Sequence, residues 1–515
     1  MAKQDSAKRK KATVVIAGAG AGKTTAMVSR ILEQLPHLRP SRALVAITYT
    51  NSASEIIRAS LEKHGVFMNN IFVGTIHAFL HRYIVQPYAA VLKVLPEDIC
   101  IGPFNVEEAI RKGRQGKSLD ARAASIARSQ ATSAMLAKGH VPFDSVLTVA
   151  RDLVELPNVR MRLGQRIQYL FIDEFQDMNK YQYDVFDHLR KEKRTEIFAV
   201  GDPEQYISGF VIRGMPKPAF SKLYFFRFLK SSERIDEMDN HRSCGELVQF
   251  TNQFRTEVQQ ISRRGMAGTP SVYFIKETSL PDIVRKFQNL ASERAGSYYQ
   301  TWRHLYLAFE NKQFLPVRDE FGMVHLNSDL SLAGSMISRV EKLIQEISEL
   351  SRRVFCQKYG IDYYGYRLIS FKLLKSIRSS SIGRANDVVA FLSKAVNAAL
   401  TVPAKLGEIE KSVIEIRNGV DPRILAAQQR HQCSSIHKAK GHEAEAVLVL
   451  AKSLTELNSW LTTDFVVRKA AKVDTHRVGY VAFTRPRELL SIACLQQLDG
   501  PTNELLGNLG VILTE

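Results

Sequence analysis

Residues 13–24 read TVVIAGAGAGKT, and this stretch decides the fold of the chain. A short apolar run is followed by a loop of small residues, by Lys23 and Thr24, and then by a helix-like segment at 25–35. Small residues let the N–H groups of such a loop, together with the start of the next helix, wrap a phosphate. The order of strand, small-residue loop, Lys-Thr and helix therefore predicts the P-loop of an α/β nucleotide-binding domain.

The polar residues of this loop have expected roles in holding a nucleoside triphosphate. Lys23 would reach the β- and γ-phosphates, and Thr24 would ligate Mg²⁺. The loop residues expected to wrap the phosphates with their N–H groups are Ala19, Gly20, Ala21 and Gly22. A strand–helix turn of small residues that binds no ligand is the alternative interpretation.

A second informative stretch, residues 169–177, reads YLFIDEFQD. An apolar run ends in the adjacent carboxylates Asp173 and Glu174. Such a pair at the end of a strand can divide the work, one carboxylate holding Mg²⁺ and the other polarising water for attack on a phosphate. The pair therefore predicts a Mg²⁺–phosphate site, which matches the phosphate loop about 150 residues earlier.

Three further apolar segments are each followed by polar residues, at 43–51, 72–79 and 197–205. Together with the two stretches above they predict a series of parallel strands and helices. The polar residues fall at the carboxyl ends of these strands, where the ligand sites of parallel α/β sheets lie.

Composition limits the partners and the compartment. The 515 residues include 71 Lys+Arg and 52 Asp+Glu, a net charge of +19, which predicts a polyanionic partner and most simply nucleic acid. The five cysteines are scattered and form no metal-binding motif. The chain has no run of 18 or more apolar residues, so no membrane span is expected. We therefore expect a cytoplasmic protein without a membrane partner. A signal peptide at the basic N-terminus is a weaker alternative, because the apolar run continues into the phosphate loop.

Eight ordered segments of the chain resemble the motifs of superfamily 1 DNA helicases of the UvrD/Rep/PcrA type. They lie at residues 17–24, 48–51, 74–77, 173–177, 201–205, 240–243, 436–443 and 480–485. The resemblance implies an α/β fold with two RecA-like parallel-sheet P-loop NTPase domains and small, mostly helical inserted domains. It implies domain 1A at 1–85 and 167–235, a reduced insert 1B at 86–166, domain 2A at 236–326 and 425–515, and a reduced 2B-like insert at 327–424.

The resemblance also implies a division of roles around ATP and Mg²⁺. Asp173 would hold the metal with Thr24, and Glu174 would orient or deprotonate the attacking water. Gln205 would sense the γ-phosphate, while Arg242 and Arg485 would act as arginine fingers from the second domain. The remaining residues expected at the nucleotide are Thr25, His241 and Glu443.

Single-stranded or tailed DNA is the partner that the resemblance implies. The residues expected to face it are Tyr49, Thr50, Asn51, His77, Phe210 and His437. Aromatic side chains stack on bases without regard to sequence. A core position is the alternative for Tyr49 and Phe210 taken alone.

The chain departs from the family pattern in two places. At the adenine pocket only Gln4 precedes the phosphate loop as a candidate for the family's adenine-reading Gln, Thr25 replaces a common Arg, and His241 replaces a stacking Tyr. At 205–210 the usual order of Ser and Tyr is exchanged, so Tyr206 would have to stack on DNA from a shifted position.

Two functions fit this pattern. The first is an ATP-dependent helicase or translocase that moves 3′→5′ on single-stranded DNA. The second is a DNA-sensing ATPase subunit of a nuclease complex, because the opening at 22–25 and the stretch 81–87 are similar to the short UvrD-like subunit of the Gabija anti-phage defence family. A housekeeping DNA-repair helicase is a further alternative, and an RNA motor is disfavoured because the motif set is that of the DNA branch.

Overall fold

The structure is a computed structural model of the chain. It describes residues 12–66, 70–89, 91–92, 95–96, 100–102, 121–207, 218–326, 336–350, 352–379, 381–400, 406–418, 430–471 and 474–514. The chain divides into two units: Met1–Val317 with Ser434–Glu515, and Arg318–Cys433. The first unit contains two parallel sheets, and the second is mostly helical.

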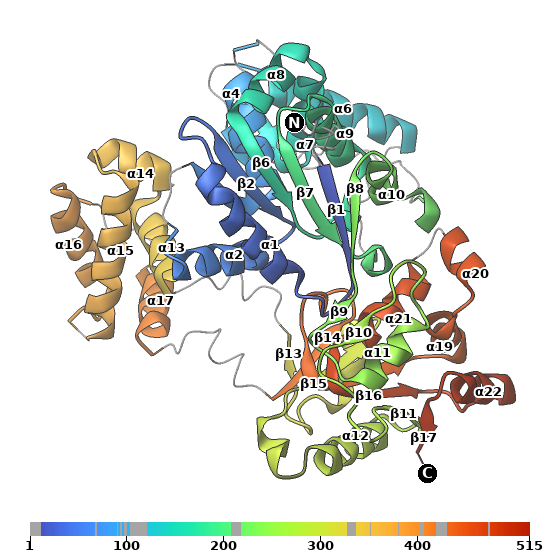
Figure 1. Ribbon diagram of the computed structural model, residues 1–515. Coiled ribbons are helices and arrows are strands. Elements are labelled where there is room, and N and C mark those ends of the chain that lie inside the picture. Colours follow the sequence, from blue (N-terminus) through green and yellow to red (C-terminus); the bar gives the residue numbers. More distant parts are fainter. Residues whose placement is uncertain are drawn as a thin grey trace. The chain divides into compact units, whose positions relative to one another are not determined.

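The first sheet begins with the predicted strand at the phosphate loop. Its strand order is β3-β2-β6-β7-β1-β8, and each pairing between neighbours is parallel. The strands are β1 (Ala12–Ala17), β2 (Ala43–Thr48), β3 (Ile71–Thr75), β6 (Ile167–Ile172), β7 (Glu196–Gly201) and β8 (Glu233–Glu237). The predicted parallel α/β series is thus confirmed for this half of the chain (Figure 1).

Helices cover both faces of this sheet. Successive side chains of a strand point to opposite faces, so one strand contributes residues to two buried clusters. Val14 and Ile16 of β1 belong to one buried cluster, whereas Val15 and Ala17 belong to the other. The second cluster packs on α1 (Lys23–Gln34) and α2 (Asn51–Lys63). The first packs on α7 (Phe143–Glu155), α9 (Lys180–Lys191) and α10 (Tyr224–Leu229). Burial on both faces is the reason these strands read as continuous apolar runs.

The region 86–166 adds short elements beside this sheet. They are α4 (Gln86–Tyr88), β4 (Cys100–Gly102), α6 (Ala121–Ala137), β5 (His140–Pro142), α7 and α8 (Pro157–Arg166). Strands β4 and β5 pair in parallel with each other. The assignment of this region as a reduced insert, domain 1B, stays a prediction.

Among the strands that lie wholly or partly in the first unit, the second sheet has the order β14-β12-β15-β16-β11-β17. Its strands are β11 (Val272–Ile275), β12 (His304–Ala308), β14 (His431–Ser435), β15 (Ala444–Ala451), β16 (Pro486–Cys494) and β17 (Ile512–Leu513). The accompanying helices are α11 (Gly245–Asn252), α12 (Leu280–Ala295), α19 (Leu454–Leu461), α20 (Phe465–Ala470), α21 (Thr475–Phe483) and α22 (Gly500–Asn508). A short parallel pair, β9 (Asp239–Asn240) with β10 (Ile261–Ser262), precedes this sheet.

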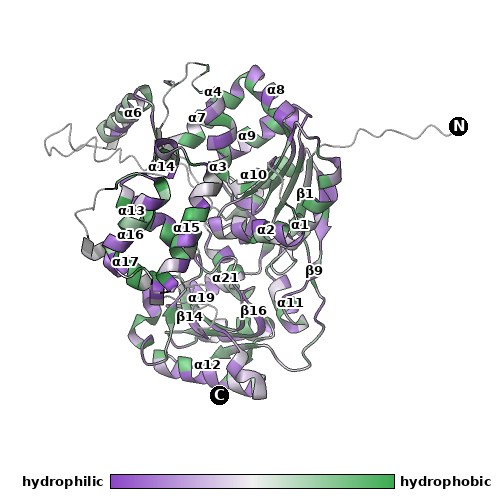
Figure 2. Ribbon diagram, turned by 90° about the vertical axis from the view of Figure 1, so that its left-hand side faces the viewer, coloured by the Kyte–Doolittle hydropathy of each residue, from purple (hydrophilic) through white to green (hydrophobic). Residues whose placement is uncertain are grey.

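The second unit is built on helices that share one apolar core. They are α13 (Met336–Ser348), α14 (Arg352–Tyr359), α15 (Tyr363–Arg378), α16 (Ala385–Val396) and α17 (Leu406–Asn418). Val340, Leu343, Ile344 and Ile347 of α13 are buried in it, with the spacing of one helix face. The helices carry hydrophobic and hydrophilic residues side by side, as expected for amphipathic helices (Figure 2). The predicted insert at 327–424 falls within the range of this unit.

Within the described ranges, the structure holds no helix long and apolar enough to cross a membrane.

Candidate nucleotide and nucleic-acid site

The phosphate loop joins β1 to α1 as the sequence predicts. Gly20 and Gly22 have φ of 77° and 71°, a left-handed conformation that favours glycine. The Lys23 Nζ donates to the carbonyl oxygens of Ala17 at 3.4 Å and Gly18 at 3.5 Å. This ammonium group therefore lies over the start of the loop, where it would meet a phosphate. Thr24 follows as the second residue of α1.

The carboxylate pair lies at the carboxyl end of β6, next to β7 in the same sheet. Glu174 has a φ of 48°, which is uncommon for a residue with a side chain and is often found at functional sites. Its N–H donates to the Asp173 Oδ1 at 2.9 Å, and its Oε2 accepts from the Gln176 Nε2 at 2.5 Å. The Gln176 Oε1 accepts from the backbone N–H of Asp202 at 3.0 Å. Gln176 thus connects the carboxylate pair to the end of β7.

The protonation of the two carboxylates differs because their neighbours differ. Burial and the neighbouring Glu174 raise the pKa of Asp173 to about 7, against the opposing effect of Lys23. Burial also disfavours the charged form of Glu174, but Lys440 and Lys23 outweigh it and lower the pKa of Glu174 to about 2. Glu174 is therefore ionised at neutral pH, as a residue that accepts a proton from water must be.

Lys440 is a member of this site to which the sequence assigned no role. Its Nζ donates to the Asp177 Oδ2 at 2.5 Å and to the backbone oxygen of Gln205 at 3.2 Å, and lies 3.8 Å from the Glu174 Oε2. It comes from the segment after β14, so it carries a positive charge from the second sheet to the carboxylates of the first. Its place inside the motif at 436–443 was the available signal.

The two predicted arginine fingers also come from the side of the second sheet. The Arg485 Nη2 donates to the Gln205 Oε1 at 3.3 Å and to the Thr484 Oγ1 at 2.8 Å. Arg485 is 1% exposed, and its burial together with the positive charge of Arg242 lowers its pKa to about 9. An anionic ligand would offset that repulsion, so the arrangement favours a phosphate here.

Arg242 lies at the phosphate loop through its own segment. The backbone N–H of His241 donates to the Gly20 carbonyl at 2.9 Å. The Arg242 Nε donates to the Glu443 Oε2 at 2.5 Å. The structure thus places Arg242, His241 and Glu443 close to the loop, and their roles toward a nucleotide stay predictions.

The residues expected to face DNA follow the carboxyl ends of strands. Tyr49 comes after β2 and is half-buried, with its hydroxyl donating to the Gln182 Oε1 at 3.2 Å. Thr50 caps α2 by accepting from the Ala53 N–H at 3.2 Å, and Asn51 is exposed. His77 is half-buried in the short helix α3 (Ile76–Phe79), which follows β3.

The remaining residues expected at DNA are His437 and Phe210, together with Tyr206 as the aromatic at a shifted position. His437 follows β14 and packs edge-on against Phe309, with ring centroids 5.4 Å apart. Phe210 lies outside the described residues. Tyr206 is 6% exposed, and its carbonyl accepts from the Arg477 Nε at 2.8 Å. A buried ring presents no free face for a base, so Tyr206 does not supply the shifted stacking aromatic in this structure.

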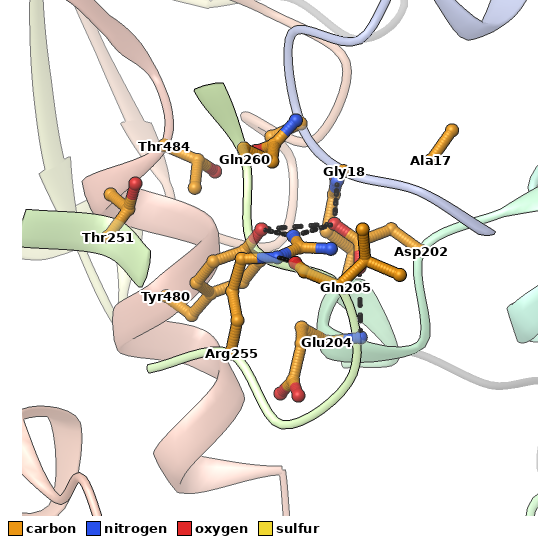
Figure 3. A network of polar contacts seen from close by, with 12 residues as sticks. Ala17, Gly18, Asp202, Glu204, Gln205, Thr251, Arg255, Gln260, Tyr480 and Thr484 are labelled. Atoms are coloured by element: carbon orange, nitrogen blue, oxygen red, sulfur yellow. Dashed lines mark hydrogen bonds and ion pairs between the residues drawn. The ribbon is translucent and has the colours of Figure 1, made fainter. Parts of the chain in front are cut away.

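A buried network of polar contacts connects the two sheets beside Gln205 (Figure 3). The Asp202 Oδ2 accepts from the Arg255 Nη1 at 3.2 Å, from the Tyr480 hydroxyl at 3.1 Å and from the Gln205 Nε2 at 2.9 Å. The Arg255 and Asp202 side chains are 1% and 0% exposed. One oxygen of Asp202 thus accepts both from the side chain of Gln205 and from two residues on the side of the second sheet, Arg255 and Tyr480.

A second buried ion pair, between Arg468 and Glu204, also connects the two sheets. The Arg468 Nη2 lies 3.1 Å from the Glu204 Oε2, and the two side chains are 2% and 1% exposed. The Glu204 Oε1 accepts from the N–H and hydroxyl of Thr256 at 2.7 and 2.6 Å. Arg255 and Arg468 lie outside the eight motifs, so neither arginine could be identified from a motif.

Removing one partner of such a pair should have a large effect on stability. We expect Arg255→Met to lower the free energy of unfolding by about 3–5 kcal/mol, because Asp202 would stay buried without its cation. Arg234→Met is the matched control, since Arg234 and Asp236 form a pair with both side chains 41% exposed. An exposed pair contributes only about 0–1 kcal/mol. Urea denaturation of both variants measures the difference, and equal losses would contradict the assignment.

The donors at this site suit ATP and Mg²⁺. Mg²⁺ in nucleotide sites takes one or two protein oxygens together with phosphate and water oxygens, which Thr24 and Asp173 can complete. No cluster of three or more His, Cys, Asp or Glu that could hold a metal by itself occurs in the described residues. Because Thr24 and Asp173 supply two oxygens, the site fits a metal that arrives with the nucleotide.

Comparisons with known proteins agree with this geometry. A family model described as an AAA domain matches residues 2–211. The chain is 25% identical over 496 residues to the Gabija protein GajB of Bacillus cereus (strain VD045), covering 93% of this chain and 92% of that protein. It is 22% identical over 600 residues to YjcD of Bacillus subtilis (strain 168), covering 95% and 78%. It is 24% identical over 278 residues to DNA helicase II of Escherichia coli (strain K12), covering 46% and 37%.

The fold and the site define the class of this protein. Two parallel sheets, a phosphate loop on one of them and arginines supplied from the other make it a P-loop NTPase with two RecA-like domains. The relatives narrow the class further. These similarities support a UvrD-like superfamily 1 helicase.

Proposed function

We propose that this protein is a DNA-dependent ATPase that couples Mg-ATP hydrolysis to movement along single-stranded DNA. One observation carries the proposal. Arg485, from the second sheet, donates to Gln205 of the first, beside the phosphate loop and the carboxylate pair. A site shared between two domains makes hydrolysis depend on their closure, which is the property a motor needs.

The residues divide the chemistry of phosphoryl transfer among them. The loop N–H groups and Lys23 bind the phosphates, while Thr24 and Asp173 hold the Mg²⁺ that neutralises charge on them. Glu174, ionised at neutral pH, accepts a proton from the attacking water. Gln205, Arg242 and Arg485 stabilise the negative charge that develops on the transferred group, and an arginine finger contributes roughly 10³–10⁵ in rate.

Polynucleotide binding is supported by the overall charge and by the position of polar residues. A net charge of +19 favours a polyanion, with affinity that falls as salt rises. Tyr49, Asn51, His77 and His437 all follow strand ends of the two sheets. Asp177 and Lys440 also follow strand ends of the two sheets and bond each other, and Lys440 contacts Glu174 and Gln205. We therefore propose that these two residues relay DNA binding to the catalytic site.

A direct experiment tests this function. We expect ATP hydrolysis to be stimulated by single-stranded DNA, and the purified protein to unwind a duplex with a 3′ tail but not one with a 5′ tail. A radiolabelled ATP assay with and without DNA, followed by a gel assay of both duplexes, measures both parts. Absence of DNA-stimulated hydrolysis would overturn the proposal, whereas unwinding from the 5′ tail would overturn the polarity alone.

A second candidate function rests on the similarity to a Gabija protein. That similarity extends over 93% of this chain and 92% of GajB, so it spans both sheets and the helical unit. In this alternative the ATPase senses DNA inside an anti-phage complex, and a nuclease subunit cleaves. ATP hydrolysis without unwinding, together with co-purification of a nuclease encoded nearby, would favour it over an autonomous helicase.

A further inference from the structure

Gln260 is a buried side chain at the phosphate loop that belongs to none of the helicase motifs. It precedes β10 and comes from the side of the second sheet. A Cβ built on Gly18 would lie 2.5 Å from both polar atoms of the Gln260 carboxamide. The carboxamide therefore packs directly on the backbone at the start of the phosphate loop, and a side chain at Gly18 would displace it (Figure 3).

The position of Gln260 is fixed by its own backbone. Its N–H donates to the Asn252 Oδ1 at 2.9 Å, and its carbonyl accepts from the Asn252 Nδ2 at 2.8 Å. Its side-chain Oε1 accepts from the Asn240 Nδ2 at 3.4 Å, and that same Asn240 nitrogen donates to the Ala19 carbonyl at 2.9 Å. The oxygen of the carboxamide is thus engaged with the segment that carries Arg242, which leaves the nitrogen to bind elsewhere.

The Gln260 Nε2 has no hydrogen-bond partner among the described residues, although the residue is only 5% exposed. A buried donor without an acceptor is unfavourable, and such groups in native proteins call for an explanation. Two cations lie at the same loop: the Lys23 Nζ donates to the Ala17 and Gly18 carbonyls, and the Arg242 side chain lies beside Gly20. The acceptor that suits both the donor and these charges is an anionic oxygen.

We propose that the Gln260 carboxamide donates to a terminal phosphate oxygen of the bound nucleoside triphosphate. Gln260 would then be a nucleotide-binding residue supplied by the second domain, in addition to Arg242 and Arg485. The contact would report the presence of the γ-phosphate to β10 and α11 through Asn252. The inference rests on the ATP binding of the proposed function and adds a specific donor to it.

Equilibrium binding separates this role from a merely structural one. Isothermal titration of the full chain with Mg²⁺ and either AMP-PNP or ADP gives two dissociation constants for each variant. Gln260→Met keeps the length of the side chain and removes its donor. We expect its dissociation constant for AMP-PNP to rise about tenfold, as for the loss of a hydrogen bond to a charged group, while that for ADP stays near the wild-type value.

The matched control is Gln259→Met, which changes an exposed glutamine one residue away. It should leave both dissociation constants unchanged. If Gln260→Met does not fold, Gln260→Asn keeps a donor but withdraws it, and a smaller loss confined to AMP-PNP is expected.

Three results would contradict the proposed role of Gln260 or the function on which it rests. Equal losses for AMP-PNP and ADP would make Gln260 a support of the loop at Gly18 rather than a ligand of the terminal phosphate. Wild-type affinity for both nucleotides would show that the carboxamide meets neither. Failure of the wild-type protein to bind AMP-PNP would instead overturn the proposed function, so the two failures are distinguishable.

Discussion

Glu174→Gln is expected to lower the turnover of DNA-stimulated ATP hydrolysis by about 10²–10⁴, the contribution typical of a general base. The amide keeps the size of the side chain and can still accept from Gln176, whose Nε2 lies 2.5 Å from the Glu174 Oε2. It cannot take a proton from water. Nucleotide binding should persist because the phosphate loop and Lys23 are unchanged.

Steady-state hydrolysis and AMP-PNP titration on the same preparation measure the two parts of this prediction. Glu196→Gln is a matched control, since Glu196 is exposed at the opposite, amino end of β7. Turnover near the wild-type level in Glu174→Gln would refute the assignment of Glu174. A parallel loss of AMP-PNP affinity would instead indicate that Glu174 helps to hold the metal.

The local parts of the site were predictable because their signals are contiguous in sequence. The strand, the glycines with positive φ and the Lys-Thr pair lie within 12–24, and their chemistry requires that order. The carboxylates of 173–174 follow their strand directly in the same way. The amphipathic spacing of α13 is a local signal of the same kind, since Val340, Leu343, Ile344 and Ile347 recur at helical spacing and are buried on one face.

The contacts between the sheets could not be predicted from one sequence. Arg255 meets Asp202 across 53 positions and Arg468 meets Glu204 across 264, with no local pattern to mark either arginine. The contact of Gln260 with Gly18 could not be predicted either, because a glutamine beside a short strand carries no pattern that marks it. Lys440 lay inside a motif, yet its ion pair with Asp177 depends on the approach of two domains.

Arg485→Ala should lower the turnover of DNA-stimulated ATP hydrolysis by about 10³–10⁵, which is the range for removing an arginine finger. This loss is at least as large as the one expected for Glu174→Gln. The physical reason is the position of its guanidinium. It is buried, donates to the Gln205 Oε1 at 3.3 Å and lies beside the positive charge of Arg242. Two cations held together in a buried site gain most when negative charge develops between the domains, so their contribution should be concentrated in the transition state.

Arg485→Lys distinguishes charge from geometry at the same position. Lysine keeps one positive charge but lacks the planar fork that bonds Gln205, Thr484 and the His442 carbonyl together. We therefore expect it to recover only a small part of the lost turnover. Arg303→Ala is the control, because Arg303 is a partly exposed arginine of the second sheet that pairs with Glu445. If Arg485→Lys restored full turnover, a positive charge alone would suffice, and Gln205 and Arg485 would not act as one unit across the two domains.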